Sequence, residues 1–294
     1  MHIRFWGTRG SIASPGPETI VYGGNTTCIE IRTNNDEVII LDGGTGIFRL
    51  GNSLAKRMPL KTSVLVTHTH WDHIQGLPFF VPLFVPGNEI KFFGTFDPVY
   101  DKSLREILSV QMEYCYYPVR ESELKARIDY ASLKDGQSTQ IGGAKITPVL
   151  MNHPVLNFGY LIQADGQRVF FTGDHEPLQN IYMPSDPEFD EYQGLISLRN
   201  NSIEDWLKDV DVLITDSMYT AEEYPGKVGW GHGSYDACIA MAKRARANHL
   251  VLTHHDPMRT DEQLDVINAA IQAEHGNCGT KLTIAREGMV IDLG

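Results

Sequence analysis

Short apolar runs, rich in β-branched and aromatic residues, recur along the chain and are bounded by Gly, Asp, Asn or Pro. Runs of about 4–8 residues with this composition are typical of strands in a protein core. The pattern predicts strands at residues 2–5, 28–33, 37–41, 63–67, 89–93, 146–149, 160–164, 168–171, 212–215, 250–253 and 282–284.

Helix signals lie between these strands. Thr260 and Gln263 have the spacing of a capping box, and Ser234 followed by Asp236 is typical of a helix start. A third helix is predicted from about 102 to 114. The first two starts are followed by apolar residues that one helix face can bury: Leu264, Ile267, Ala270 and Ile271 in one, and Ile239, Met241, Ala242 and Ala245 in the other. Strands that alternate with helices predict an α/β protein with layered sheets.

Two segments of the first half are echoed in the second. Val-Leu-Val-Thr-His at 64–68 resembles Leu-Val-Leu-Thr-His at 250–254, and the apolar run before Asp42 resembles the run before Asp174. The echo predicts two related lobes in one domain, residues 1–294, whose strands deliver polar side chains to a shared edge. The most irregular stretch, 176–201, is predicted to be a long loop that forms a lid or a homodimer contact.

The charge of the chain restricts its partners. Its 294 residues include 25 Lys and Arg against 37 Asp and Glu, which gives a net charge of −12. The densest basic cluster, at 243–246, is short, so the chain lacks the basic stripe that a nucleic-acid backbone requires. Long nucleic acids are therefore poor candidates as partners, whereas a small ligand remains compatible with this charge.

Cysteine usage and the apolar segments indicate a compartment. The four cysteines are scattered without a Cys-x-x-Cys pair, which is typical of free thiols in a reducing environment. The longest apolar stretch, 78–86, contains three prolines and is shorter than the ~20 residues that cross a membrane. No signal peptide is visible at the start. We expect a cytoplasmic protein without a membrane partner.

The densest chemical signal is the run His-Thr-His-Trp-Asp-His at 68–73, directly after a predicted strand. Imidazole nitrogens bind Zn, Fe and Ni, and carboxylates bind harder ions. His68 and His70 can point the same way from such a loop and chelate one ion, while Asp72 and His73 lie one turn further on and can serve a second. The run predicts a metal site.

A two-metal site needs more ligands than this run supplies. Three residues that follow other apolar runs could complete it, namely His153, Asp174 and His254. Loops at the ends of buried strands converge, so we expect these side chains to meet the 68–73 run.

This combination resembles the metallo-β-lactamase-fold hydrolases, from Phe-Trp-Gly-Thr-Arg-Gly at 5–10 through the final Thr-His at 253–254. The resemblance implies a four-layer αββα sandwich of two related lobes. It implies two ligand sets that share Asp174: His68, His70, His153 and Asp174 for one ion, and Asp72, His73, Asp174 and His254 for the other. His175 and His255 directly follow ligands, and whether either contributes stays open.

Two further features resemble the phosphodiesterase branch of that superfamily, which includes tRNA 3′-end processing ribonucleases and cyclic-phosphate phosphodiesterases. His232 stands in Gly-His-Gly-Ser, and Asp216 ends a predicted strand. In that branch a His of a His-Ser-Thr-like motif pairs with an acidic residue at the scissile phosphate. The motif here departs from that pattern, since Gly follows the His and the acid is Asp rather than Glu. A Gly-rich loop and a strand-end cap are the structural alternatives.

The implied chemistry assigns roles to these residues. Two divalent ions, with Zn²⁺ expected and Mn²⁺ or Fe²⁺ as alternatives, lower the pKa of a bridging water and clamp the oxygens of an in-line displacement. Asp72, His232 and Asp216 are the expected catalytic residues, with His232 as the proton donor to the leaving group. Substrate contacts are expected from Arg9, Asn25, Trp230 and Ser234. A structural turn is an equal alternative for Arg9, and for most of the aromatic residues a place in the core is favoured over a role in the site.

The favoured function is a binuclear-metal-dependent hydrolase, a phosphodiesterase for a small anionic substrate such as a cyclic nucleotide or cyclic sugar phosphate. One alternative is a thioester, lactone or β-lactam hydrolase, which would need the metals but not the pair of His232 and Asp216. A tRNA 3′-processing ribonuclease is less favoured, because no basic Gly/Pro-rich arm is found. A non-enzymatic metal or redox sensor is the remaining alternative.

Overall fold

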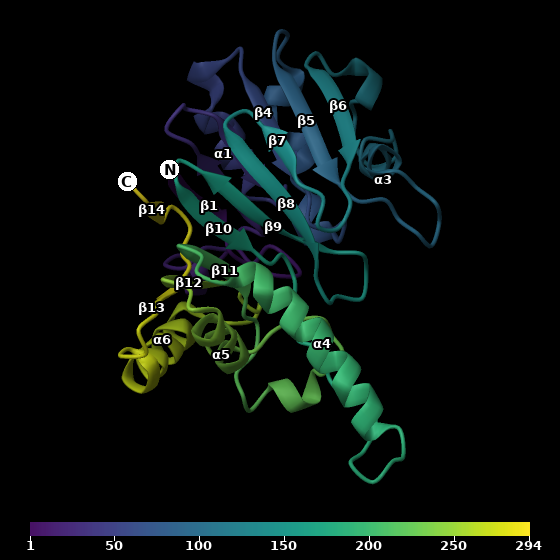
Figure 1. Cartoon of the computed structure of the whole chain (residues 1–294). Helices are drawn as coiled ribbons and strands as arrows, with labels where there is room; N and C mark the ends of the chain where they lie inside the picture. Colours follow the sequence, from purple (N-terminus) through teal and green to yellow (C-terminus); the bar gives the residue numbers. More distant parts are fainter.

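The computed structural model describes residues 1–294 and contains two seven-stranded sheets. In the first sheet the strand order is β14-β1-β2-β3-β4-β5-β6. Its strands are β1 (His2–Gly7), β2 (Cys28–Arg32), β3 (Val38–Leu41), β4 (Lys61–Leu65), β5 (Glu89–Gly94), β6 (Arg127–Ser132) and β14 (Val290–Asp292). The chain termini lie close together because β1 pairs with β14 (Figure 1).

The second sheet has the order β13-β12-β11-β10-β9-β8-β7. Its strands are β7 (Thr139–Ile141), β8 (Ala144–Leu150), β9 (Phe158–Ala164), β10 (Gln167–Phe171), β11 (Val212–Asp216), β12 (His249–Thr253) and β13 (Lys281–Ile284). Each sheet joins an antiparallel half to a parallel half: β3 to β6 run parallel in the first, and β10 to β13 in the second. This repeated arrangement confirms the two related lobes.

Six helices accompany the sheets. They are α1 (Ile47–Ser53), α2 (Trp71–Ile74), α3 (Leu104–Val110), α4 (Phe189–Leu207), α5 (Tyr235–Ala245) and α6 (Asp261–His275). Apolar residues of α1 and α3 pack on the first sheet, whereas those of α4, α5 and α6 pack on the second (Figure 1). The result is the predicted layering of helices, sheet, sheet and helices.

Alternating side chains explain why the strand sequences are apolar without a break. In β3, Ile39 and Leu41 belong to the cluster between the two sheets, whereas Val38 and Ile40 belong to the cluster under α1. Successive side chains of a strand point to opposite faces, so a strand covered on both faces needs apolar residues at every position.

Every predicted strand is present, and three strands were not predicted. These are β6, β7 and β14, each at the edge of its sheet with no fully buried residue. An edge strand that is half exposed needs no continuous apolar run. Its composition therefore does not separate it from a loop.

The prediction of a loop over 176–201 is wrong from residue 189 onward, because α4 begins there. The helix buries only Ile196, Ile203 and Leu207, and its sequence is otherwise polar and includes Gly194. Sparse apolar positions in a polar segment leave a weak helical pattern, and the contact with the second sheet stabilises the helix. The helix expected from 102 to 114 is also shorter, since α3 ends at Val110.

Two other expectations concern the whole chain. All four cysteines are free, as predicted. Among the helices, none combines the length and the apolar character that a membrane crossing requires.

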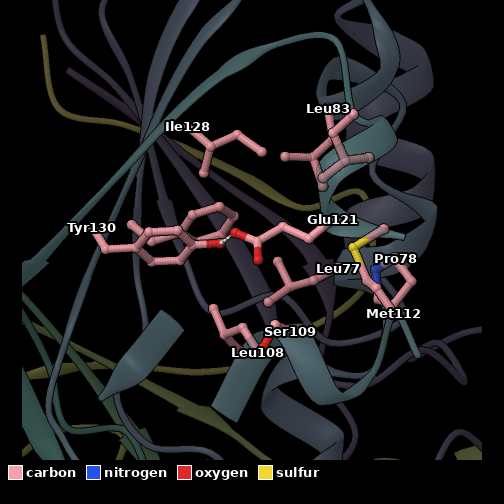
Figure 2. A pocket seen from close by; sticks show the side chains of 11 residues that line it. Leu77, Pro78, Leu83, Leu108, Ser109, Met112, Glu121, Ile128 and Tyr130 are labelled. Atoms are coloured by element: carbon pink, nitrogen blue, oxygen red, sulfur yellow. Dashed lines mark hydrogen bonds between the residues drawn. The ribbon is translucent and has the colours of Figure 1, made fainter. Parts of the chain in front are cut away.

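A small apolar cavity of about 20 Å³ lies between α3 and the first sheet, and the hydrogen bond from Tyr130 to Glu121 crosses it (Figure 2). That volume suits one or two water molecules and is too small for a substrate.

Candidate metal centre and active site

The ends of several strands deliver polar side chains to one edge shared by the two sheets. His68 follows β4, Asp174 follows β10 and His254 follows β12, and all three strands lie in parallel halves of their sheets. His153 follows β8. Parallel strands end at the same edge, so residues that are far apart in sequence meet there.

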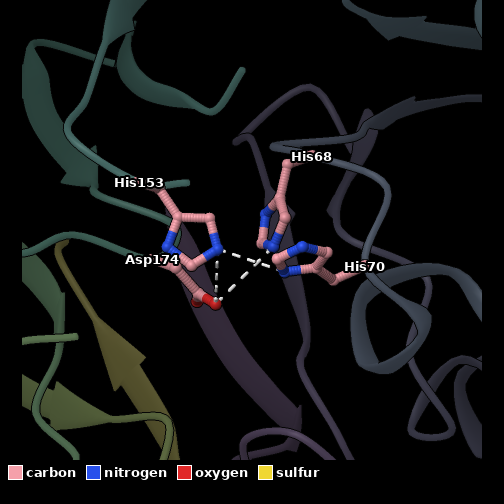
Figure 3. Close-up of side chains that lie close together, drawn as sticks. All are labelled: His68, His70, His153 and Asp174. Atoms are coloured by element: carbon pink, nitrogen blue, oxygen red, sulfur yellow. Dashed lines mark hydrogen bonds and ion pairs between the residues drawn. The ribbon is translucent and has the colours of Figure 1, made fainter. Parts of the chain in front are cut away.

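The first cluster consists of His68, His70, His153 and Asp174, whose ligand atoms all lie within 4.8 Å of one another (Figure 3). His153 Nε2 is 3.1 Å from His70 Nδ1. Asp174 Oδ2 is 3.6 Å from His68 Nε2 and 3.9 Å from His153 Nε2. Three imidazoles and a carboxylate thus converge on one small volume.

The second cluster consists of Asp72, His73, Asp174 and His254. Asp174 Oδ1 is 3.2 Å from both His73 Nε2 and His254 Nε2. Asp72 Oδ2 is 3.3 Å from His73 Nε2 and 3.1 Å from His254 Nε2. Asp174 therefore directs one oxygen to each cluster, and the structure brings together all seven residues that the sequence predicted as ligands.

These donors fit divalent cations. His68 Nε2, His73 Nε2 and Asp174 Oδ1 are buried and have no hydrogen-bond partner, although buried polar atoms are nearly always paired. Burial lowers the pKa of His68 and His153 below the ordinary value and that of His70 to about 4. These three imidazoles are neutral at pH 7, the form that binds a metal.

Asp42 orients His73 and was not predicted as a site residue. Its Oδ2 lies 2.8 Å from His73 Nδ1, and the backbone N–H of Thr67 donates to its Oδ1 at 2.8 Å. A carboxylate behind a ligating imidazole sets its tautomer and ring orientation. The sequence did contain a signal for Asp42. This residue directly follows the apolar strand β3, just as Asp174 follows the apolar strand β10 after two intervening residues.

His232 and Asp216 form a contact beside the clusters. His232 Nδ1 is 2.8 Å from Asp216 Oδ2, while Asp216 Oδ1 is 3.5 Å from Nδ1 of His254. Burial lowers the pKa of His232, but the carboxylates of Asp216 and Asp174 together outweigh burial and raise that pKa above the ordinary value. The His232 side chain remains 12% exposed, so this imidazole can both hold a proton and reach a ligand.

Glu176 anchors the loop that carries His232, and sequence reasoning missed it. The backbone N–H groups of Gly229 and Gly231 donate to its carboxylate at 2.9 Å and 2.8 Å, and the Tyr224 hydroxyl donates at 2.7 Å. Gly231 O in turn lies 3.0 Å from His153 Nδ1. A buried carboxylate with three donors holds this loop in place, but two of the donors are backbone N–H groups and the third is a hydroxyl 48 residues away, a set that no spacing rule reveals.

The four expected substrate contacts differ in their surroundings. Arg9 is fully buried and donates from Nε to Gly23 O at 2.7 Å and from Nη1 to Arg259 O at 2.6 Å, so it holds loops together as in the turn alternative. The backbone N–H and side-chain amide of Asn25 donate to the carboxylate of Glu287 at 2.6 Å and 3.0 Å.

The other two expected contacts lie near His232. Ser234 is buried and accepts a hydrogen bond from Ala237 N as the N-cap of α5. Trp230 is 57% exposed, and Lys227 Nζ lies 4.0 Å from its ring centroid. Only Trp230 therefore presents a large free surface beside the site.

His175 and His255 point away from the ligand clusters. His175 Nδ1 accepts a hydrogen bond from Asn152 N at 3.2 Å, and His255 Nε2 lies 2.9 Å from Ala285 O. Neither belongs to a group of residues that could hold a metal ion. Both imidazoles serve packing behind the ligands that precede them.

Comparison with known proteins identifies a family and several proteins to which this chain is similar. Residues 38–255 match the profile of the Beta-lactamase superfamily domain. Ribonuclease Z of Staphylococcus aureus is 21% identical over 305 aligned positions, which cover 93% of this chain and 95% of that protein.

Solved structures share the fold over nearly the whole chain. YhfI, a metallo-β-lactamase fold protein of Bacillus subtilis, has a TM-score of 0.69 at 18% identity and covers 99% of this chain and 98% of its own. The short form of human tRNase Z has a TM-score of 0.64 at 19% identity and covers 100% of both chains. A diphosphatase of the PhnP family has a TM-score of 0.65 at 16% identity and covers 100% of this chain and 98% of its own.

Proposed function

The chain belongs to the metallo-β-lactamase superfamily of metal-dependent hydrolases, and we propose that it cleaves a small phosphodiester such as a cyclic nucleotide or cyclic sugar phosphate. The observation that carries the proposal is the contact of His232 Nδ1 with Asp216 Oδ2 directly beside Asp174. A thioester hydrolase would not need this pair, because a thiolate leaves without a proton. The alkoxide leaving group of a phosphodiester requires a proton, which a His oriented by a carboxylate can donate.

The two clusters would hold two divalent ions, with Asp174 facing both. His68, His70 and His153 are imidazole donors that suit Zn²⁺, and the added carboxylates of Asp72 and Asp174 also suit Mn²⁺ or Fe²⁺. When bound, such ions polarise phosphoryl oxygens and make a water nucleophilic at neutral pH. The backbone N–H of Ser11 donates to Asp72 Oδ2 at 2.7 Å and fixes that carboxylate.

His232 supplies the proton for the leaving group. With Nδ1 held by Asp216 Oδ2, the proton to be donated is at Nε2, and the carboxylate of Asp216 favours the protonated imidazole. The second oxygen of Asp216 faces His254, so one carboxylate orients both a proton donor and a ligand. Trp230, exposed beside His232, stacks on a base or ring of the substrate in this proposal.

The net charge of −12 supports a small substrate over RNA. The ribonuclease Z and tRNase Z relatives and the PhnP-family diphosphatase support phosphate-ester chemistry. The lack of a basic Gly/Pro-rich segment in the sequence favours a small substrate over tRNA. The four free thiols support action in a reducing cytoplasm. Leu195 and Leu198 on α4 are exposed apolar side chains that a homodimer contact could bury.

The test is a substrate panel with metal-reconstituted protein and His232→Ala. We expect hydrolysis of bis-p-nitrophenyl phosphate and of one cyclic phosphate, but not of a thioester or nitrocefin. For the cyclic phosphate, with its poor leaving group, His232→Ala should lose about 10²–10⁴-fold in kcat while it retains its metals. Activity within about threefold of wild type would refute the proton-donor role, and hydrolysis of the thioester or nitrocefin alone would refute the phosphodiesterase.

A further inference from the structure

We propose that a cavity beside the first ligand cluster is the subsite for an uncharged apolar substituent of the phosphodiester, namely the ester group that remains on phosphorus. This inference rests on the proposed phosphodiesterase function and narrows its substrate class to open-chain phosphodiesters, since in a cyclic phosphate the leaving oxygen and the oxygen that stays on phosphorus belong to the same ring. The cavity has a volume of about 230 Å³. Its lining comes from three segments: Thr69, residues 95–100 with Ile107, and residues 154–156.

The cavity adjoins the site through the ligands themselves. Thr69 stands between His68 and His70, and Pro154 directly follows His153. His70 and His153 are in contact, with 3.1 Å between Nδ1 and Nε2. Two walls of the cavity are therefore formed by the immediate chain neighbours of these two imidazoles.

The lining selects against charge. It contains no Lys, Arg or His, and its one carboxylate is that of Asp97, whose Oδ1 accepts hydrogen bonds from the N–H groups of Val99 at 2.8 Å and Tyr100 at 3.4 Å. A second phosphate would meet this carboxylate, while Lys102 Nζ lies outside the lining, 6.0 Å from the ring centroid of Tyr100. The remaining lining is mostly aromatic and aliphatic: Phe96, Pro98, Val99, Tyr100, Ile107, Pro154, Val155 and Leu156.

The rim holds apolar side chains in solvent. Val99 is 79% exposed and Tyr100 74% exposed, with Phe96 at 45%. The turn that carries them is closed by Asp97 and by reciprocal backbone hydrogen bonds between Asp97 and Lys102. A ligand that covers these apolar groups removes them from water, which favours binding by about 25 cal/mol for each Å² of apolar surface buried.

The position of His153 indicates which substituent enters. Its Nδ1 contacts Gly231 O in the loop of His232, whereas its Nε2 lies 3.1 Å from Nδ1 of His70, the chain neighbour of Thr69 in the cavity lining. His153 thus contacts the loop of the proton donor through one ring nitrogen and the ligand next to the cavity through the other. The leaving group must reach His232, so the cavity receives the group that stays on phosphorus.

The experiment uses p-nitrophenyl phosphodiesters whose second ester group is methyl, phenyl or 1-naphthyl, so that p-nitrophenolate leaves in every case. The variants are Val99→Asp and Val155→Ser, and the matched control is Val266→Asp, since Val266 is 65% exposed on α6. We expect Val99→Asp to lower kcat/KM about 10–100-fold for the phenyl and naphthyl esters and less than about threefold for the methyl ester. The control should leave all three rates unchanged.

A binding measurement provides a second readout. Calorimetric titration of the metal-loaded protein with diphenyl phosphate and dimethyl phosphate should show tighter binding of diphenyl phosphate, by about 10-fold or more, in wild type and in the control but not in Val99→Asp or Val155→Ser. Equal losses for methyl and aryl esters in both cavity variants, or an unchanged preference for diphenyl phosphate, would overturn the subsite. Hydrolysis of a cyclic phosphate but of none of the three esters would also overturn the subsite, whereas absence of hydrolysis of the esters and of the cyclic phosphates alike would instead overturn the proposed function.

Discussion

Asp216 shows how much one side chain contributes to this site. Its two oxygens face two imidazoles, at 2.8 Å from His232 Nδ1 and 3.5 Å from His254 Nδ1. The carboxylate of Asp174 similarly faces both ligand clusters. Since buried carboxylates require compensating partners, each of these residues is tied to several histidines at once, and its removal should affect them together.

Asp174→Ala should remove both metal ions together, because Asp174 directs Oδ2 to the first cluster and Oδ1 to the second. The measurement is metal content per chain after gel filtration, compared with His153→Ala, which alters only the first cluster. Two ions per chain in Asp174→Ala would refute the shared role. The His153 variant should retain the ion of the second cluster.

Glu176→Gln should loosen the loop that carries His232 and Trp230. The carboxylate accepts hydrogen bonds from Gly229 N, Gly231 N and the Tyr224 hydroxyl. An amide in its place keeps the shape but replaces one oxygen with a donor, which cannot accept from these groups. We expect about a 10-fold loss in kcat/KM, mainly through KM, with the metals retained.

The control for this variant is Glu222→Gln, at an exposed position of the same loop region. It should behave as wild type. Loss of metal in Glu176→Gln would indicate a general folding defect and would contradict a role confined to the loop.

At the scale of elements, the strands that deliver ligands are the buried central ones, and the edge strands deliver none. β4, β10 and β12 lie inside their sheets, whereas β6, β7, β13 and β14 lie at the edges. The apolar runs that predict the central strands therefore also locate the site, because each run ends where a ligand loop begins. The position of α4 was not predictable in this way, since its polar sequence lacks a continuous apolar face.

The pairing of β12 with β13 should make stability depend on pH. Burial, and then the charge of Lys281 on β13, lower the pKa of His249 to about 4, and its Nε2 lies 2.8 Å from the Thr283 hydroxyl. An unfolded His titrates near 6.5. The neutral imidazole therefore contributes stability above about pH 6.5 that is lost as the pH falls towards 4.

The expected loss is at most about 3 kcal/mol in the free energy of unfolding. Urea unfolding at several pH values between 7.5 and 4.5 measures it, and His249→Gln isolates it, because the other titrating groups remain in both proteins. The variant should lose less stability than wild type over this range. Parallel curves for the two proteins would contradict the assignment.

At the scale of the whole molecule, the metal clusters join the two lobes. The 68–73 run comes from the lobe of the first sheet, whereas His153, Asp174 and His254 come from the lobe of the second. A bound ion would therefore connect the sheets across their shared edge and would bind the folded chain alone. Such binding stabilises a protein in proportion to the logarithm of free metal over Kd.

Removal of metal with a chelator should lower the melting temperature. At free metal 100–1,000 times Kd, each site contributes about 3–4 kcal/mol to the free energy of unfolding. Calorimetric melting with and without chelator, with metal content checked in parallel, measures the change. Asp174→Ala should melt at the same temperature with and without chelator, and a wild-type melting temperature that stays constant after complete metal loss would contradict the prediction.

The sequence by itself determined the central strands, the two-lobed α/β layering and the seven residues that meet at the sheet edge. Buried strands require unbroken apolar runs, and the ligand types stand at the ends of those runs. Only the tertiary structure decided the edge strands, α4, the role of Glu176, the burial of Arg9 and the cavity beside His70 and His153. These features depend on contacts between residues far apart in the chain and on backbone groups, whose identity leaves no pattern in the sequence.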